Sequence, residues 1–201
     1  MMKKLNKPLL WFILSFIGFH IILFIMWGEY NVYWQLYTGI MLIAGISYVF
    51  YQRDIASKRL LTSIGIGLAA GVLLVLVQVI IALITSDLSY TSLIKQLSRT
   101  GVYFKWQMLI TLLCVMPCHE LYMRTILQKE LTLLTQRPWI GIVTSAILSS
   151  SFFIYLDRWW IVLFIFICQL ILGFSYAYTR RIVTTTVAQI VAVVLLLIFH
   201  G

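Results

Sequence analysis

Long apolar stretches alternate with short polar gaps along the chain. Each stretch is close to the roughly 20 residues that an α-helix needs to cross the hydrocarbon core of a bilayer. None of them alternates apolar and polar residues in the way that a strand of a membrane β-barrel does. The pattern therefore predicts seven transmembrane helices, at residues 8–27, 32–51, 60–85, 104–134, 139–156, 159–178 and 182–199.

The composition excludes a soluble domain. Hydrophobic residues make up 62% of the 201 residues and charged residues 10%, with a mean hydropathy of +1.01. A soluble domain is about 45–50% apolar and about 25% charged. Because no linker or shift in composition divides the sequence, we expect one membrane domain over residues 1–201. It would be an all-α, multi-pass bundle of about seven helices, with three spans and an outer loop in 1–103 and a core in 104–201.

The net charge of +9 does not indicate nucleic-acid binding, because the basic residues are not gathered on one polar face. With a cytoplasmic N-terminus, eleven of the fifteen cations lie on the inner side, in agreement with the positive-inside rule. We therefore expect a protein of the cell membrane, embedded in the lipid bilayer, with its C-terminus outside. The lack of a long soluble domain suggests a bacterial plasma membrane. The inner cations are Lys3, Lys4, Lys7, Arg53, Lys58, Arg59, Arg124, Lys129, Arg137, Arg180 and Arg181, and the outer ones are Lys95, Arg99, Lys105 and Arg158.

The ends of the predicted spans carry two further signals. The longest polar stretch, residues 87–101, places Leu93, Ile94 and Leu97 at helical spacing. It is therefore either a short helix on the outer surface or a solvated loop. Six tryptophans lie near span ends, where amphipathic rings prefer the headgroup level of the bilayer. They are Trp27, Trp34, Trp106, Trp139, Trp159 and Trp160.

Small residues recur at regular spacing in the third predicted span. Ser63, Gly67 and Gly71 are four residues apart, which allows another helix to approach closely in a membrane. Residues 65–70 also match a glycine-rich dinucleotide-binding turn, but no strand precedes them and no acidic residue follows at the right distance. We therefore interpret this segment as a helix-packing face.

The fourth predicted span holds the densest group of polar residues at membrane depth. Ionisable side chains there cost about 2.5 kcal/mol or more each on insertion scales, so they mark candidate functional sites. Glu120 and Arg124 are one helical turn apart and can form an ion pair, whereas His119 points about 100° away from Glu120. Pro117 has no backbone donor and predicts a kink, which would open space for water or a ligand. Alternatively, Glu120 and Arg124 only pin neighbouring helices together.

The other polar residues in the spans are isolated from one another in the sequence. Amide side chains in membrane helices usually hydrogen-bond one helix to another, and each such bond contributes on the order of 1 kcal/mol. The lone histidine of the first span has no evident partner, so we interpret it as structural. The group consists of His20, Gln78, Gln107, Gln169 and Gln189, with Asp157 near the end of the fifth span.

The string His119-Glu120-x-x-x-Arg124, followed by two further motif-like segments, resembles the CPBP family of CAAX-prenyl-endopeptidase-like intramembrane proteases. This family, also called the Abi proteins, includes bacteriocin self-immunity proteins. Its first motif is Glu-Glu-x-x-x-Arg, so Glu120 and Arg124 match it and His119 stands in place of the first glutamate. Its second motif is Phe-x-x-x-His, which Phe153-x-x-x-Asp157 resembles with Asp157 in place of the histidine.

The third motif of the family combines a glycine in one helix, a short basic turn, and His-x-x-x-Asn in the next helix. Gly173 and the turn at residues 180–181 reproduce this layout, and Gln189 and Val193 stand in place of the histidine and the asparagine. The resemblance extends over residues 106–195, about the C-terminal half of the chain. It implies the fold of the CPBP intramembrane proteases.

In that family the first glutamate activates the water that attacks a peptide carbonyl, while the histidines and the asparagine position that water or a metal and stabilise the oxyanion. This chain keeps Glu120 and Arg124 but replaces the other four polar groups. The resemblance therefore implies a catalytically impaired relative, a pseudoenzyme that binds a membrane protein or peptide in bacteriocin self-immunity or in regulation of an envelope protein. The alternative is an active intramembrane endopeptidase, in which His119 or Glu120 is the base and Asp157 and Gln189 assist.

A divalent metal is a further possibility, because His119, Glu120 and Asp157 offer ligand types that zinc accepts. Depth in the membrane separates two of the candidates, however. At about 1.5 Å per residue, Gln189 lies about 12 Å from the inner end of its span, whereas Asp157 lies near the outer end of its own. The candidate site residues, namely His119, Glu120, Arg124, Asp157 and Gln189, therefore converge only if these spans are tilted or broken.

Overall fold

A computed structural model describes residues 7–49 and 60–200 of the chain. In these residues helices are joined by short turns and no strand is formed. The α-helices are α1 (Lys7–Ile25), α2 (Tyr30–Val49), α3 (Leu60–Ile84), α4 (Tyr90–Arg99), α5 (Lys105–Ile110), α6 (Met116–Glu120), α7 (Lys129–Thr135), α8 (Pro138–Ser151), α9 (Trp159–Thr179) and α10 (Ile182–His200). Two 3₁₀ turns, Ser86–Leu88 and Ile154–Leu156, and two π-helical segments, Thr111–Val115 and Leu121–Gln128, complete the described structure.

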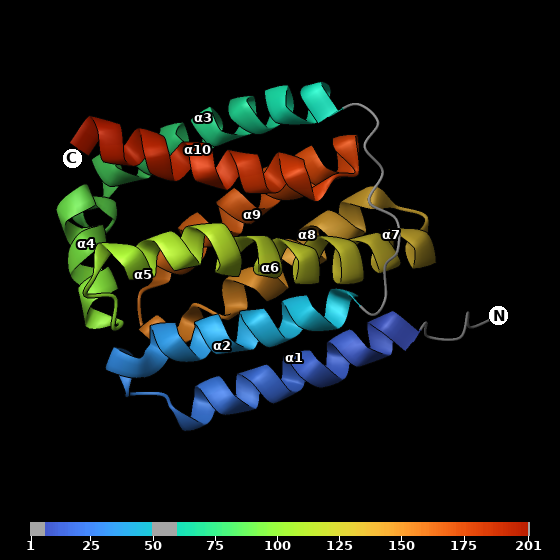
Figure 1. The fold of residues 1–201 in the computed structure, drawn as a ribbon, viewed down its shortest axis with the longest axis horizontal. Coiled ribbons are helices and arrows are strands. Elements are labelled where there is room, and N and C mark those ends of the chain that lie inside the picture. The colour runs from blue at the N-terminus through green and yellow to red at the C-terminus, as the bar shows by residue number, and fades with distance from the viewer. Residues whose placement is uncertain (1–6, 50–59, 201) are drawn as a thin grey trace.

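The long helices lie side by side along one axis (Figure 1). α1 and α2 form one edge of the bundle, α3 and α10 form the opposite edge, and α5 to α7 run between them in front of α8 and α9 (Figure 1). Helix α4 lies across one end. The helix α1 begins at the other end of the bundle, whereas α10 ends beside α4 (Figure 1).

Six helical stretches of the described chain are long and apolar enough to cross a membrane, at residues 7–25, 60–84, 106–135, 138–156, 159–179 and 182–199. They correspond to the first and the third to seventh predicted spans, so the prediction of an all-α membrane-type bundle is confirmed. The second predicted span is helical as α2 but is not one of the six, and its first turns carry Asn31 and Gln35. The end of that span and the cations Lys3, Lys4, Arg53, Lys58 and Arg59 lie outside the described residues.

The fourth span is continuous from α5 through α6 to α7 and contains the two π-helical segments. Pro117 lies at the start of α6, between those segments. The turn before it is widened, because the backbone N–H of Met116 donates to Thr111. Proline removes one backbone donor, and such wider turns are one way for a helix to accommodate it. The interruption that the sequence predicts at Pro117 therefore takes the form of π-helical turns.

The small residues of α3 allow α10 to lie against its backbone. A Cβ atom on Gly67 would come within 2.7 Å of the Thr184 carbonyl oxygen, and one on Gly71 would come within 2.8 Å of the Ala188 carbonyl oxygen. Ser63, one turn earlier, is also buried. The helix-packing interpretation of this segment is therefore confirmed.

At the end of the bundle, residues 90–99 form the amphipathic helix α4 rather than a solvated loop. Its N-terminus is capped by Ser89, whose hydroxyl accepts a hydrogen bond from the Ser92 backbone N–H. Trp27, Trp106 and Trp159 are exposed near this end, as expected for an aromatic belt. Trp34 differs, because it is half-buried and its Nε1 donates to Thr111 Oγ1 at 2.9 Å.

His20 also has partners that the sequence did not reveal. Its Nδ1 lies 2.8 Å from Tyr155 Oη and its Nε2 lies 3.0 Å from Ser151 Oγ. Its ring stacks on Phe152, with ring centroids 5.1 Å apart. These contacts tie α1 to the end of α8 and agree with a structural role for His20.

We predict that Gly67→Ala destabilises the protein by about 1–3 kcal/mol, the usual cost of overpacking a tight contact. The added methyl group would force α3 and α10 apart. The matched control is Gly65→Ala, because no atom lies within 4 Å of a Cβ at Gly65. The control should be neutral or slightly stabilising, since alanine has the higher helix propensity. The free energy of unfolding in detergent measures both, and equal effects would contradict the close packing of α3 on α10.

Candidate functional site

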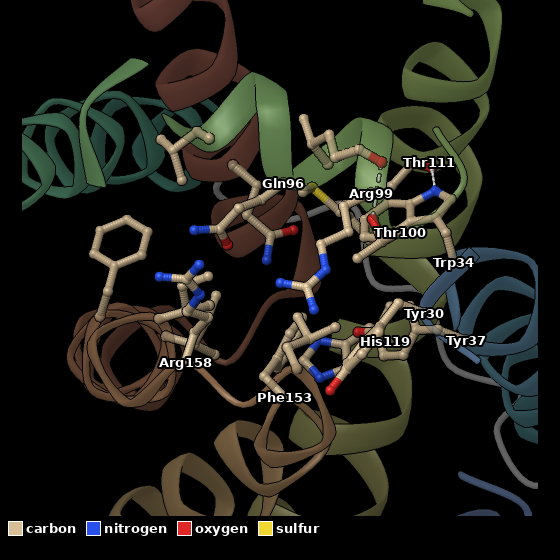
Figure 2. A pocket seen from close by; sticks show the side chains of 18 of the residues that line it. Tyr30, Trp34, Tyr37, Gln96, Arg99, Thr100, Thr111, His119, Phe153 and Arg158 are labelled. Carbon is tan, nitrogen blue, oxygen red and sulfur yellow. Dashed lines mark hydrogen bonds between the residues drawn. The ribbon is translucent and has the colours of Figure 1, made fainter. Parts of the chain in front are cut away.

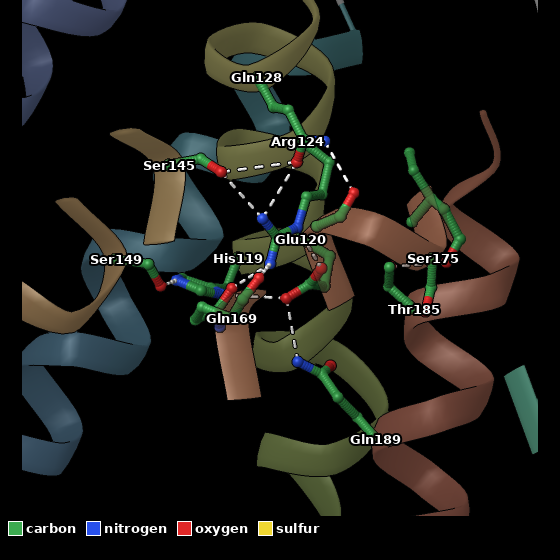
Figure 3. A network of polar contacts seen from close by, with 12 residues as sticks. His119, Glu120, Arg124, Gln128, Ser145, Ser149, Gln169, Ser175, Thr185 and Gln189 are labelled. Carbon is green, nitrogen blue, oxygen red and sulfur yellow. Dashed lines mark hydrogen bonds and ion pairs between the residues drawn. The ribbon is translucent and has the colours of Figure 1, made fainter. Parts of the chain in front are cut away.

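The side chain of Arg124 lies at the centre of a polar network in the bundle interior (Figure 3). A guanidinium has five N–H donors and no acceptor. Nε donates to Glu120 Oε2 at 3.0 Å, and Nη1 donates to Gln128 Oε1 at 3.1 Å and to Ser145 Oγ at 3.0 Å. Nη2 donates to the backbone oxygen of Gln169 at 3.0 Å and to Gln169 Oε1. Every donor of this fully buried cation is therefore used.

The partners of Arg124 come from three helical stretches. Glu120, Arg124 and Gln128 follow one another at four-residue intervals along the fourth span, so they share one side of it. Ser145 comes from α8 and Gln169 from α9. The amide of Gln128 also donates from Nε2 to the Gly173 carbonyl oxygen at 2.9 Å.

The absence of a side chain at Gly173 allows α9 to approach Arg124 and α8 closely. A Cβ atom at this position would lie 2.9 Å from Ile142 Cγ2 and 3.2 Å from Arg124 Nη1. The first distance is too short for a real side chain, so α8 and α9 would have to separate. The glycine of the third motif-like segment is therefore explained by the close approach of α9 to Arg124 and α8.

Both carboxylate oxygens of Glu120 are engaged. Oε2 accepts from Arg124, and Oε1 accepts from Gln189 Nε2 at 3.0 Å. His119 Nδ1 lies 3.5 Å from the same Oε1. The Glu120 side chain is fully buried, with 0% of its surface exposed. The network thus joins α10 to the fourth span through Gln189 (Figure 3).

The other ring nitrogen of His119, Nε2, lies 2.8 Å from Ser149 Oγ (Figure 3). Ser149 is one turn after Ser145 on α8. The ring of Tyr37 lies on another side of the imidazole, with centroids 6.3 Å apart. His119 is therefore held between α8 and α2.

A cavity of about 320 Å³ lies next to this network (Figure 2). This volume is within the range of about 300–1,000 Å³ that is usual for ligand pockets. His119, Gln169 and Gln189 line it, whereas Glu120 does not. Its other lining residues are Tyr30, Trp34, Tyr37, Leu93, Gln96, Leu97, Arg99, Thr100, Thr111, Met116, Phe153, Leu156, Arg158, Ile161, Phe164 and Ile165.

Four of the five candidate site residues meet in this network, but Asp157 does not. Asp157 follows the 3₁₀ turn after α8 and has a left-handed backbone, with φ of 54°. Its Oδ2 accepts hydrogen bonds from Tyr30 Oη and, at 3.4 Å, from Trp27 Nε1. The arrangement in which Asp157 orients His119 is therefore not formed. The depth argument explains this, because α8 reaches the level of His119 at Ser149, and Asp157 lies farther along the chain, beyond the end of α8.

The donor set does not fit a metal ion. Among residues 7–49 and 60–200, no three His, Cys, Asp or Glu side chains gather closely enough to hold one. His119 and Glu120 are adjacent, but Asp157 bonds to residues of the α1–α2 turn and α2 instead.

The sequence analysis missed several residues of the network and the cavity. Gln128 continues the four-residue spacing of Glu120 and Arg124, so that pattern could have identified it. Gln169 was interpreted only as an amide that hydrogen-bonds one helix to another. Nothing in the sequence places Arg99, Gln96 or Trp34 beside the site, because these residues belong to α4 and α2, which are distant in the sequence from the fourth span.

We predict that Arg124→Lys destabilises the protein by at least about 2 kcal/mol, because a lysine ammonium has three donors and would leave acceptors of the network unpaired. Arg158→Lys is the matched control. Arg158 is 42% exposed and has one ion pair, at 3.2 Å to Asp87, so the control should lose at most about 1 kcal/mol. Unfolding by denaturant in detergent compares the two variants. A loss at Arg124→Lys no larger than the control would contradict the network.

Comparison with known proteins agrees with the resemblance in the motif-like segments. Residues 101–195 match the family model described as type II CAAX prenyl endopeptidase Rce1-like. No curated protein and no solved structure matches the chain. The matched segment begins just after α4 and includes the whole network around Arg124. The match confirms, for residues 101–195, the resemblance to the CPBP family that the motif-like segments indicate.

Proposed function

We propose that this protein is a catalytically impaired relative of the CAAX-type intramembrane endopeptidases and acts by binding a membrane protein or peptide in the cavity beside Glu120. Bacteriocin self-immunity or regulation of an envelope protein would be roles of this kind. The proposal has two parts, the loss of peptide hydrolysis and the retention of a binding site. Different features of the site support each part.

The observation that carries the first part is the engagement of Glu120. A general base must come within about 2.6–3.2 Å of the proton that it abstracts. Glu120 Oε1 and Oε2 already accept hydrogen bonds from Gln189 and Arg124, and the side chain does not line the cavity. A water molecule in the cavity would therefore meet the Gln189 amide and the His119 ring before it met the carboxylate.

The second part is supported by the cavity itself. Its walls are mostly aromatic and aliphatic side chains from α2, α4, the segment that follows α8, and α9. Pockets of this size with few polar groups typically bind a ligand by apolar contact and orient it by hydrogen bonds. Three of its polar residues, His119, Gln169 and Gln189, lie where the cavity meets the network, and others, such as Gln96 and Arg99, come from α4.

The second candidate function is an active endopeptidase with His119 as the base. It is favoured by one observation, since His119 both borders the cavity and lies beside Glu120. In this candidate, His119 would take a proton from water through one of its ring nitrogens, and Gln189 would assist. Against it, Nε2 of His119 is already within hydrogen-bond distance of Ser149.

The orientation in the membrane is part of the same proposal. We infer a cytoplasmic N-terminus and an outer C-terminus in a bacterial plasma membrane. This orientation would place the two termini on opposite sides of the membrane, because α1 begins at one end of the bundle and α10 ends at the other (Figure 1). The helix α4 would then lie at the outer surface.

Quantitative N-terminal proteomics on membranes tests the loss of hydrolysis. We compare a deletion strain with strains that carry the wild type, Glu120→Gln or His119→Gln at matched levels of folded protein. The second variant is needed because Glu120→Gln leaves the buried Arg124 without a counter-charge, which costs about 3–5 kcal/mol and risks unfolding. We expect the same N-terminal peptides in all strains.

Cleavage that depends on the protein would contradict the proposed loss of hydrolysis. New N-termini that appear only with the wild type and disappear in His119→Gln would establish the active endopeptidase and would identify its substrate. Cleavage that persists in His119→Gln but disappears in folded Glu120→Gln would assign the base to Glu120. Either result would contradict the impaired enzyme.

A further inference from the structure

Two buried polar atoms that border the cavity have no hydrogen-bond partner among the described residues. They are Oε1 of Gln189, an acceptor, and Nε2 of Gln96, a donor. Gln189 cannot satisfy its oxygen by turning its amide over, because its Nε2 already donates to Glu120. A buried acceptor or donor without a partner costs about 1–3 kcal/mol, so a ligand that pairs with these atoms gains affinity.

The cavity also has a cation that lacks a carboxylate partner. Arg99, the last residue of α4, lines the cavity, and no carboxylate lies within 4.0 Å of it in the described part of the chain. Its guanidinium lies over the ring of Tyr30, 4.3 Å from the ring centroid, which holds it in place. Arg158, the other lining arginine, is paired with Asp87. No aspartate or glutamate lines the cavity.

Apart from its polar residues, the cavity is lined by apolar side chains. Leu93 and Leu97 of α4 and Phe164 and Ile165 of α9 all line the cavity. Gln96 and Arg99 are labelled in Figure 2 with their side chains turned toward the cavity. The ligand must therefore combine an anionic group, apolar side groups, and at least one donor and one acceptor.

We propose that the cavity binds an acidic peptide segment in extended form, with a side-chain carboxylate on Arg99 and backbone groups on Gln96 and Gln189. The backbone N–H would donate to Gln189 Oε1, and a backbone carbonyl would accept from Gln96 Nε2. The apolar side chains of the segment would contact the walls. This inference rests on the proposed binding function and adds the chemistry of its ligand.

The unpaired amide atoms favour a peptide over a lipid. An anionic lipid could place its phosphate on Arg99, but its acyl chain has no donor or acceptor for Gln189 and Gln96. Filling the cavity with an acyl chain would leave both atoms buried and unpaired. A peptide backbone carries one donor and one acceptor in nearly every residue and can satisfy both.

Photolabelling with defined peptides tests the proposal on the full chain in phosphatidylcholine vesicles. The probe is an N-acetylated, C-amidated peptide of alternating leucine and alanine that begins with aspartate and carries one photoreactive leucine. A second probe has asparagine in place of aspartate. Mass spectrometry locates the labelled residues, and titration gives the half-saturating concentration of each probe. We expect labels on cavity residues and about five- to tenfold tighter binding of the aspartate probe, as one charged hydrogen bond provides.

Two variants of α4 provide the matched comparison. Arg99→Gln should abolish the preference for aspartate, whereas Lys95→Gln should retain it, because Lys95 is exposed on the same helix and does not line the cavity. Gln96→Leu should weaken both probes alike, by about threefold or more, through loss of one hydrogen bond. These variants change an outer helix and leave the Arg124 network intact.

Each of the remaining outcomes of the labelling experiment would contradict a specific part of the proposal. Equal binding of the two probes, with cavity labelling, would overturn the acidic specificity and leave the proposed peptide binding in place. Absence of cavity labelling by either probe would contradict both this inference and the proposed binding function. Labelling that is lost when phosphatidylglycerol is added to the vesicles would assign Arg99 to a lipid phosphate and overturn the peptide ligand.

Discussion

A guanidinium buried at membrane depth must have every one of its N–H groups satisfied, and most of the core follows from this constraint. The bilayer offers no water to an unpaired donor, and insertion scales assign about 2.5–3.5 kcal/mol to a charged side chain at the centre of a span. Arg124 meets the constraint with one carboxylate and four neutral acceptors. The acceptors come from the fourth span, α8 and α9, so the registers of these helices are fixed relative to one another.

The close packing of helices around Arg124 also helps to provide an acceptor for each of its N–H groups. Gly173 has no side chain, which allows α9 to approach closely enough for the Gln169 backbone carbonyl to accept from the guanidinium. Gln189 adds α10 to the network through Glu120, and α10 in turn lies against the glycines of α3. Small residues and amides thus act together, because close helix approach is what brings the polar groups within hydrogen-bond distance.

The same arrangement underlies the proposed loss of peptide hydrolysis. A carboxylate that acts as a base needs an accessible oxygen, but the two oxygens of Glu120 neutralise Arg124 and accept from Gln189. The cavity remains beside the network and keeps unpaired polar atoms at Gln189 and Gln96. A site of this kind is better suited to hold a ligand than to activate water, which is the physical basis of the proposed binding function.

The sequence by itself determined the elements and the local pairs. Apolar runs of about 20 residues fix where helices cross the membrane, and four-residue spacing fixes that Glu120 and Arg124 lie on one side of a helix. It also identified the packing face at Gly67. Only the tertiary structure decided that Gln189 reaches Glu120 while Asp157 stays with Tyr30, and that α4 brings Arg99 to the cavity. The reason is that spacing along a chain specifies depth and face, whereas contact between helices depends on their lateral packing, which no single helix encodes.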